Sequence, residues 1–205
     1  MGDIIPTKSR RALLRGLIVS PVAVATVATT PWGEAVAALH HQYDDQPAEI
    51  VRSREGRSLS RFRYHNAESF CFGIDHGLFD GDGGEMLYQS GIVVQLALSS
   101  HLLDVGFADE WNARHIRLDV AKALAYANAT GFGHPCLAMA RLAITLSPYW
   151  KWGHAHRFDD PRPDNGGFTV AQVRPLLHAL LDRVHDVTGH PRPAGWKRGR
   201  QETGS

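Results

Sequence analysis

Residues 149–158 hold the most unusual concentration of chemically active side chains in this chain. Aromatic rings beside Lys and Arg can stack on sugars, bases or aromatic ligands. In an extended loop, His154 and His156 would point the same way, because they are two residues apart. The segment predicts a ligand-binding loop that uses Tyr149, Trp150, Trp152, His154, His156 and Arg157. The alternative is a long loop over 149–167 that its tryptophans anchor to the core.

A second group of candidate residues lies in the last apolar repeat of the chain. His178, Asp182 and His185 follow one another at spacings of four and three, which places them on one face of a helix. Two imidazoles with a carboxylate could hold zinc if another part of the chain supplied a further ligand. The His-Glu-x-x-His motif of zinc proteases is not present in this stretch. The pattern supports either a metal site or an ordinary polar outer face.

Acidic residues also gather around the glycine-rich turn at 80–84. Asp75, Asp80, Asp82 and Glu85 offer carboxylates of the kind that hard cations bind. The turn does not match an EF-hand loop, because Glu85 stands where that loop requires glycine. The pattern therefore favours a solvated junction between two helices.

Cys71 and Cys136 are the only cysteines in the chain. In an oxidising compartment they can pair, and closing so long a loop stabilises by about 4 kcal/mol in the chain-entropy model. Two buried thiols are the equally supported alternative. The sequence leaves the choice open.

Charge is balanced overall but unevenly distributed. The chain has 22 Lys and Arg against 21 Asp and Glu, a net charge of +1, which argues against a dedicated nucleic-acid binder. Residues 64–113 contain no Lys or Arg. Just before them lies a group of five arginines: Arg52, Arg54, Arg57, Arg61 and Arg63. These arginines either face acidic residues of the same molecule or form a basic arm for phosphate or anionic lipid.

The first 37 residues have the three parts of an export signal in order. A basic start is followed by an uncharged, mainly apolar stretch over 16–28 and by the small-x-small site Ala35-Val36-Ala37. Pro21 interrupts the apolar stretch and Pro31 follows it, and the stretch is also too short to span a membrane easily. The pattern predicts a mature protein that begins near Ala38.

The basic start also resembles a twin-arginine export signal. Ser9, Arg10, Arg11 and Leu14 match the pattern Ser-Arg-Arg-x-Phe-Leu-Lys. The resemblance implies the twin-arginine translocon as a partner and a periplasmic or exported location. An uncleaved leader, which could tether the protein to a membrane, is the alternative. The residues that carry this interpretation are Arg10, Arg11, Ala35 and Ala37.

Apolar periodicity predicts helices for the remainder of the chain. The expected helical segments lie near 66–79, 85–103, 109–130, 135–147 and 169–188, the last with a Thr169–Gln172 capping box. We therefore expect an all-α single domain of four to five helices, with an N-terminal signal helix and a long loop before the last helix. The expected divisions are a signal segment at 1–37, a flexible Arg-rich linker at 38–63, a helical domain at 64–190 and a basic tail at 191–205.

Function is only weakly constrained by these patterns. Phosphate-loop, dinucleotide-binding and Gly-x-Ser-x-Gly motifs are all lacking, and the sequence leaves the cofactor unknown. The favoured hypothesis is an exported accessory or binding module that uses the 149–167 loop. One alternative is a metal-assisted enzyme that uses the histidines. Another is a cytoplasmic protein whose arginine-rich arm contacts nucleic acid or an anionic membrane.

Overall fold

The structure is a computed structural model that describes residues 32–79, 83–153 and 163–193. These residues form seven α-helices, one π-helical turn and one 3-10 turn, and they contain no strand. The all-α prediction is confirmed, with more helices than the four or five expected. The elements are α1 (Gly33–Tyr43), α2 (Arg54–Asp75), α3 (Gly83–Val105), α4 (Asp109–Trp111), η2 (Asn112–Ile116), α5 (Val120–Ala129), α6 (Leu137–Leu146), η3 (Tyr149–Trp152) and α7 (Val170–Thr188).

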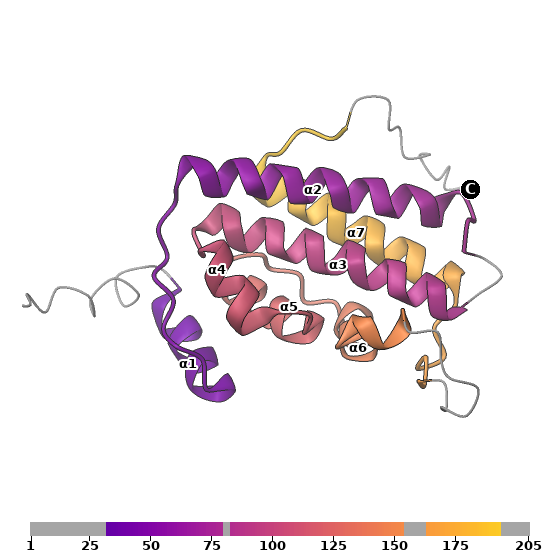
Figure 1. The fold of residues 1–205 in the computed structure, drawn as a ribbon, viewed down its shortest axis with the longest axis horizontal. Helices are drawn as coiled ribbons and strands as arrows, with labels where there is room; N and C mark the ends of the chain where they lie inside the picture. Colours follow the sequence, from indigo (N-terminus) through magenta and orange to yellow (C-terminus); the bar gives the residue numbers. More distant parts are fainter. Residues whose placement is uncertain (1–31, 80–82, 154–162, 194–205) are drawn as a thin grey trace, which may run out of the picture.

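Helix α3 is the centre of the bundle, and α2, α5, α6, η3 and α7 all pack on it. Figure 1 shows α2 and α3 running side by side, with α7 next to them and α5 and α6 on the other side of α3. Most of α3 is buried, including Leu87, Val94, Leu98 and Leu102. An apolar surface on all sides is typical of a helix at the middle of a core. None of the described helices combines the length and apolar character that a membrane span needs.

Helix α2 differs from two sequence-based predictions. It occupies part of the segment expected to be a flexible linker, 38–63, and it begins before the helix start expected at Asn66. It begins at Arg54, after Ser53, whose side chain accepts a hydrogen bond from the Gly56 backbone N–H. Its buried face includes Ser60, Tyr64, Ala67, Cys71 and Ile74. The spacing is helical, but the first of these residues is a small polar one, so the apolar pattern is weak where the helix begins.

The expected helix over 109–130 is also interrupted. It consists of the short helix α4, the π-helical turn η2 and then α5. Arg117 adopts φ 52° and ψ −120° between η2 and α5, and Asp119 begins α5 by accepting a hydrogen bond from the Lys122 backbone N–H. The residue sequence here favours a helix throughout, but the side chain of Asp119 stabilises a new N-terminus.

Helix α1 lies in a segment that was assigned partly to the signal and partly to the linker. Val36 is fully buried and His40 nearly so, and α1 packs against α5. After α1, Asp45 accepts hydrogen bonds from Lys122 Nζ and Tyr126 Oη, both at 2.7 Å. Burial opposes ionisation, but these hydrogen bonds hold the pKa of Asp45 below its usual value. Residues 33–48 are thus a folded part of the bundle.

Gly106, which follows α3 as expected for a helix stop, fixes the path of the chain before α2. Its φ is +115°, and its carbonyl accepts a hydrogen bond from the Val51 backbone N–H at 3.0 Å. A Cβ at this position would lie 2.7 Å from the Val51 carbonyl carbon.

We therefore expect Gly106→Ala to lower the free energy of unfolding by about 2 to 3 kcal/mol, through backbone strain and overpacking. Urea unfolding measures this difference. Gly83→Ala is the control, because a Cβ at Gly83 meets nothing within 4 Å. Equal losses in the two variants would contradict the steric explanation.

Candidate functional site

The aromatic segment at 149–158 is only partly within the described residues. His154, His156 and Arg157 lie outside them, as does the side chain of Trp150. The ring of Tyr149 packs against α3 where Gly91 leaves room, since a Cβ on Gly91 would lie 2.3 Å from the Tyr149 Cβ. Trp152 is 6% exposed and belongs to the core. The described part of this segment therefore supports an anchor rather than an exposed binding surface.

The structure does not bring His178, Asp182 and His185 together around a common point. His178 Nε2 lies 2.8 Å from Asp75 Oδ1. Asp182 forms an ion pair with Arg192, at the beginning of the expected basic tail. His185 Nδ1 donates a hydrogen bond to the His190 carbonyl at 2.7 Å. The described structure therefore does not gather these three side chains into the expected metal site, because each has a different partner.

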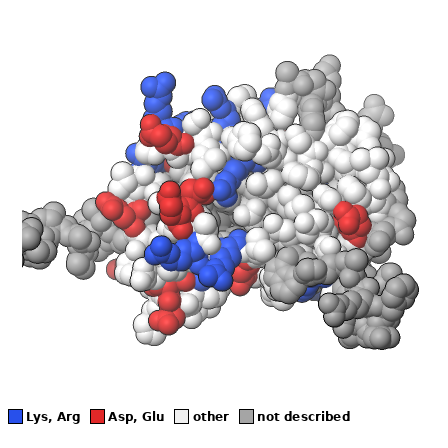
Figure 2. Space-filling model, viewed as in Figure 1, with Lys and Arg blue, Asp and Glu red and all other residues white. Residues whose placement is uncertain are grey.

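The arginine-rich segment contacts acidic residues of the same molecule. Arg57 Nη1 lies 2.6 Å from Asp104 Oδ1, and Arg63 Nη2 lies 2.5 Å from Asp109 Oδ1. Figure 2 shows acidic and basic side chains intermixed on the half of the face where α4 lies in Figure 1. The intramolecular interpretation is confirmed for these two arginines.

The residues assigned to the export signal divide between two parts of the chain. Arg10 and Arg11 lie outside the described residues. Ala35 and Ala37 lie on the exposed side of α1, on either side of the buried Val36. The predicted cleavage site therefore falls inside a helix that packs on the core.

Both cysteines are thiols in the structure. Cys71 is buried on α2, and Cys136 is half-buried at the start of α6. The pairing that the sequence left open is therefore not formed here. Cys71 lies instead near Asp75 and His178, and one potential ligand atom from each of the three lies within 4.8 Å of the others.

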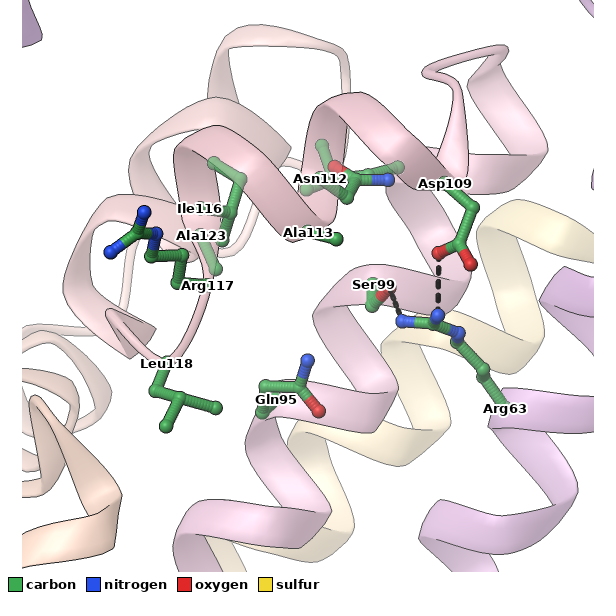
Figure 3. A pocket seen from close by; sticks show the side chains of 11 residues that line it. Arg63, Gln95, Ser99, Asp109, Asn112, Ala113, Ile116, Arg117, Leu118 and Ala123 are labelled. Carbon is green, nitrogen blue, oxygen red and sulfur yellow. Dashed lines mark hydrogen bonds and ion pairs between the residues drawn. The ribbon is translucent and has the colours of Figure 1, made fainter.

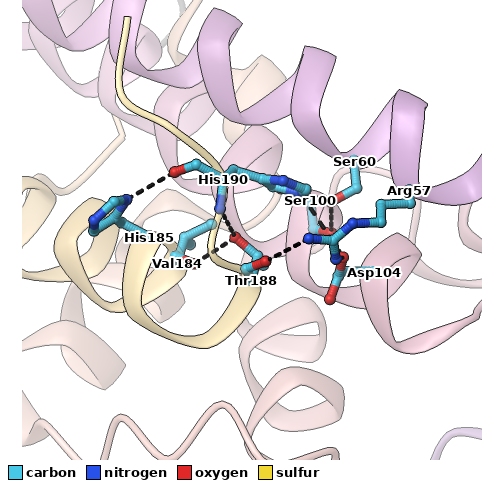
Figure 4. Close-up of polar contacts among 8 residues, drawn as sticks. All are labelled: Arg57, Ser60, Ser100, Asp104, Val184, His185, Thr188 and His190. Atoms are coloured by element: carbon cyan, nitrogen blue, oxygen red, sulfur yellow. Dashed lines mark hydrogen bonds and ion pairs between the residues drawn. The ribbon is translucent and has the colours of Figure 1, made fainter.

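A buried polar network contains the residue types of a Ser-His-Asp triad (Figure 4). Ser60 Oγ lies 2.7 Å from His190 Nε2 but donates its own hydrogen bond to the Ser100 carbonyl. The Ser60 proton is therefore not directed at the imidazole, as nucleophilic activation requires. Burial lowers the pKa of His190 to about 4, although Asp104 opposes this effect. We assign the network to stability.

A cavity of about 340 Å³ lies where α2, α3, α4, η2 and the start of α5 meet. This volume is within the range of small-molecule sites. Figure 3 shows Arg63 and Arg117 at opposite ends of the cavity, with η2 on one side and Gln95 and Ser99 of α3 on the other. The apolar part of the lining comes from Leu102, Ala113, Ile116, Leu118 and Ala123.

Asn112 is the most informative residue of this cavity. The residue is 5% exposed, and neither its amide nitrogen nor its amide oxygen has a hydrogen-bond partner in the described structure. A buried amide without partners costs about 1 to 3 kcal/mol. Both atoms have almost no accessible surface, so a ligand in the cavity would satisfy them only after the Asn112 side chain rotates.

The two arginines give the cavity a positive charge. Arg63 is held in place, because Nη1 donates to Ser99 Oγ at 2.6 Å and Nη2 pairs with Asp109. Arg117 is exposed, and its Nε donates to the Arg114 carbonyl. With Asp109 offsetting one arginine, a net charge of one positive unit remains. π-Helical turns and unusual backbone angles, both present here, often occur at functional sites.

Sequence reasoning missed this cavity because its polar residues lie far apart in the chain and carry no motif. Arg63 was assigned to a linker, and Asn112 and Arg117 to a regular helix. Asp119, as a potential helix N-cap soon after Arg117, was the one local signal of a break.

Comparisons of this chain with protein-family models, with curated proteins and with solved structures found no match.

Proposed function

We propose that this protein binds a small organic anion in the cavity between α3 and η2. The observation that carries the proposal is the net positive charge of a cavity with an exposed arginine, Arg117, at one end and the unpartnered amide of Asn112 in its wall. A carboxylate or a similar group could pair with Arg117 at one end of the cavity, and a polar group at the other end could reach the Asn112 amide if that side chain rotates (Figure 3). The apolar lining suits a hydrocarbon or aromatic body behind that group.

A thermal-shift screen tests this function with benzoate, hexanoate and a set of phosphate monoesters. We expect a monocarboxylate with an apolar body to raise the melting temperature of the unaltered protein. Arg117→Gln is expected to remove most of that shift. Arg114→Gln is the matched control, because Arg114 is exposed on the same turn but does not line the cavity. A screen without any shift would contradict the proposal.

Asn112→Leu gives a sharper prediction, because it should change binding and stability in opposite directions. The leucine removes two unpartnered polar atoms, and the adjacent cavity gives room for its larger side chain, so the free energy of unfolding without ligand is expected to rise by about 1 kcal/mol. The same change should abolish the ligand-induced shift in melting temperature. Urea unfolding and the thermal-shift screen measure the two effects. A loss of stability together with unchanged ligand response would refute the role given to Asn112.

The export signal predicted in the first 37 residues supports export of this protein, with the twin-arginine translocon as the partner that transports it. Export is tested by the N-terminal residue of the protein recovered from fractions of its native cells. A start near Ala38 in an exported fraction would support this location. A start at Met1 or Gly2 in the cytosol would contradict it.

A further inference from the structure

Cys71, Asp75 and His178 form a group that the anion-binding cavity does not include. Cys71 and Asp75 are four residues apart on α2, so they lie on one face of that helix. His178 comes from the middle of α7, which packs beside α2. One ligand atom from each residue lies within 4.8 Å of the other two.

These distances are close to those of a metal centre. Ligand atoms on a tetrahedral zinc ion lie about 3.3 to 3.6 Å apart, as the zinc–ligand bond lengths require. Side-chain shifts of about 1 Å would therefore bring the three atoms to bonding distance. His178 Nε2 lies 2.8 and 3.0 Å from the two Asp75 oxygens, so a metal ion would replace this hydrogen bond.

The surroundings favour a divalent cation. A thiolate and a carboxylate together carry two negative charges. The group also lies at the C-terminal end of α2, where the helix dipole favours positive charge, and the last turn of α2 contains no basic residue. Arg174 of α7 is a nearby cation, and its guanidinium donates to the Ile74 carbonyl at 2.6 and 3.0 Å.

Access and ligand type narrow the choice of metal. The side chains of Asp75 and His178 are 29% and 32% exposed, whereas Cys71 is 1% exposed. An ion can therefore approach from the side of Asp75 and His178, and water can take a fourth position. Sulfur and imidazole ligands select zinc and similar transition metals over magnesium and calcium.

We propose that Cys71, Asp75 and His178 form a binding site for one zinc-like transition-metal ion. Binding replaces the thiol proton of Cys71 with a metal–sulfur bond and releases that proton to solvent. The site lies outside the anion-binding cavity, so it does not depend on the function proposed above.

Equilibrium dialysis and cobalt substitution test the site on the full chain. We expect one zinc ion per chain, and we expect Co²⁺ to give a near-ultraviolet charge-transfer band that only a bound thiolate produces. His178→Gln should weaken zinc binding by about a hundredfold or more, since even changes to residues around metal ligands cost 10- to 100-fold. Cys71→Ser should remove the cobalt band.

Two controls separate this site from other sources of metal binding. Cys136→Ser keeps Cys71 and should keep the band, and His185→Gln alters the same helix but should not change zinc affinity. Circular dichroism checks that Cys71→Ser folds, and if it does not, His178→Gln decides, because that side chain is partly exposed. Loss of the band in Cys136→Ser, or no band in the unaltered protein, would overturn the proposal.

Discussion

A version of the protein that begins at Ala38 is expected to have a free energy of unfolding about 4 kcal/mol lower than a version that begins at Trp32. Val36 is fully buried, and burial of a valine stabilises by about 1.5 to 3 kcal/mol. Trp32 is half-buried over Gly131, with its indole nitrogen 3.3 Å from where a Gly131 Cβ would lie. Its loss should add about 1 to 2 kcal/mol, less than the 3 to 5 kcal/mol of a fully buried tryptophan.

The remainder of α1 should also be weakened by the truncation. It would keep residues 38–43 only, and so short a helix needs tertiary contacts to form. His40 would still be required to pack against Trp111 and Tyr126. Circular dichroism during urea unfolding measures the stability of both versions.

Point variants separate the loss of Val36 from the loss of helix length. Val36→Ala in the full chain should lower the free energy of unfolding by about 1 to 2 kcal/mol, whereas Ala35→Ser on the exposed side should change it little. Equal stability of the versions beginning at Trp32 and Ala38 would show that residues 32–37 contribute little. That outcome would remove the conflict between the fold and cleavage before Ala38.

The helices that sequence reasoning located best are those whose signals are local. In α7, Thr169 and Gln172 form the expected capping box, and Gly189 adopts the left-handed conformation that ends the helix. Its buried residues, including Val173, Leu177 and Val184, repeat at helical spacing. Caps and apolar repeats lie within a few residues of each other, so one sequence is enough to show them.

The start of α2 was missed because its interior contacts are polar. Ser60 is fully buried, yet it resembles a loop residue in a segment rich in arginine. Its buried hydroxyl forms hydrogen bonds with Ser100 of α3 and with His190, which follows α7. Contacts between residues so far apart in the chain leave no periodic pattern, so composition alone favoured a linker.

The candidate sites were hard to predict for the same reason. His178 was identified as a potential metal ligand, but the helical spacing suggested Asp182 and His185 as its partners. The structure instead places Asp75, 103 positions away in the chain, against it. Helical spacing shows which residues share one face of α7. Which residues contact that face depends on how α2 packs on α7.

Stability is expected to fall by about 4 kcal/mol or more when the pH is lowered from 7 to 5, chiefly because His101 and His190 are buried in the neutral form, and burial lowers the pKa of His40 and His134 as well. Burial lowers the pKa of His101 and of His190 from 6.5 to about 4. His101 Nε2 lies 3.2 Å from Thr130 Oγ1, whose own hydrogen bonds go to the carbonyls of Tyr126 and Ala127. His190 is enclosed by the network of Figure 4.

Whether stability rises or falls with pH depends on which state, folded or unfolded, binds more protons. Between pH 6.5 and about 4, the unfolded chain protonates both histidines while the folded protein keeps them neutral. Unfolding therefore takes up protons, and the free energy of unfolding falls as the pH falls through this range. Each histidine contributes about 2 kcal/mol between pH 7 and pH 5. Above pH 7 neither histidine should affect the pH dependence.

Urea unfolding at pH 7 and pH 5 measures the loss, and single variants assign it. His101→Gln and His190→Gln should each reduce stability at pH 7, since each removes a buried imidazole from its hydrogen bond. Each should also remove about 2 kcal/mol of the difference between pH 7 and pH 5. His41→Gln is the control, because His41 lies on the exposed face of α1 and should leave that difference unchanged. A full difference in both buried-histidine variants would show that other groups bind the protons.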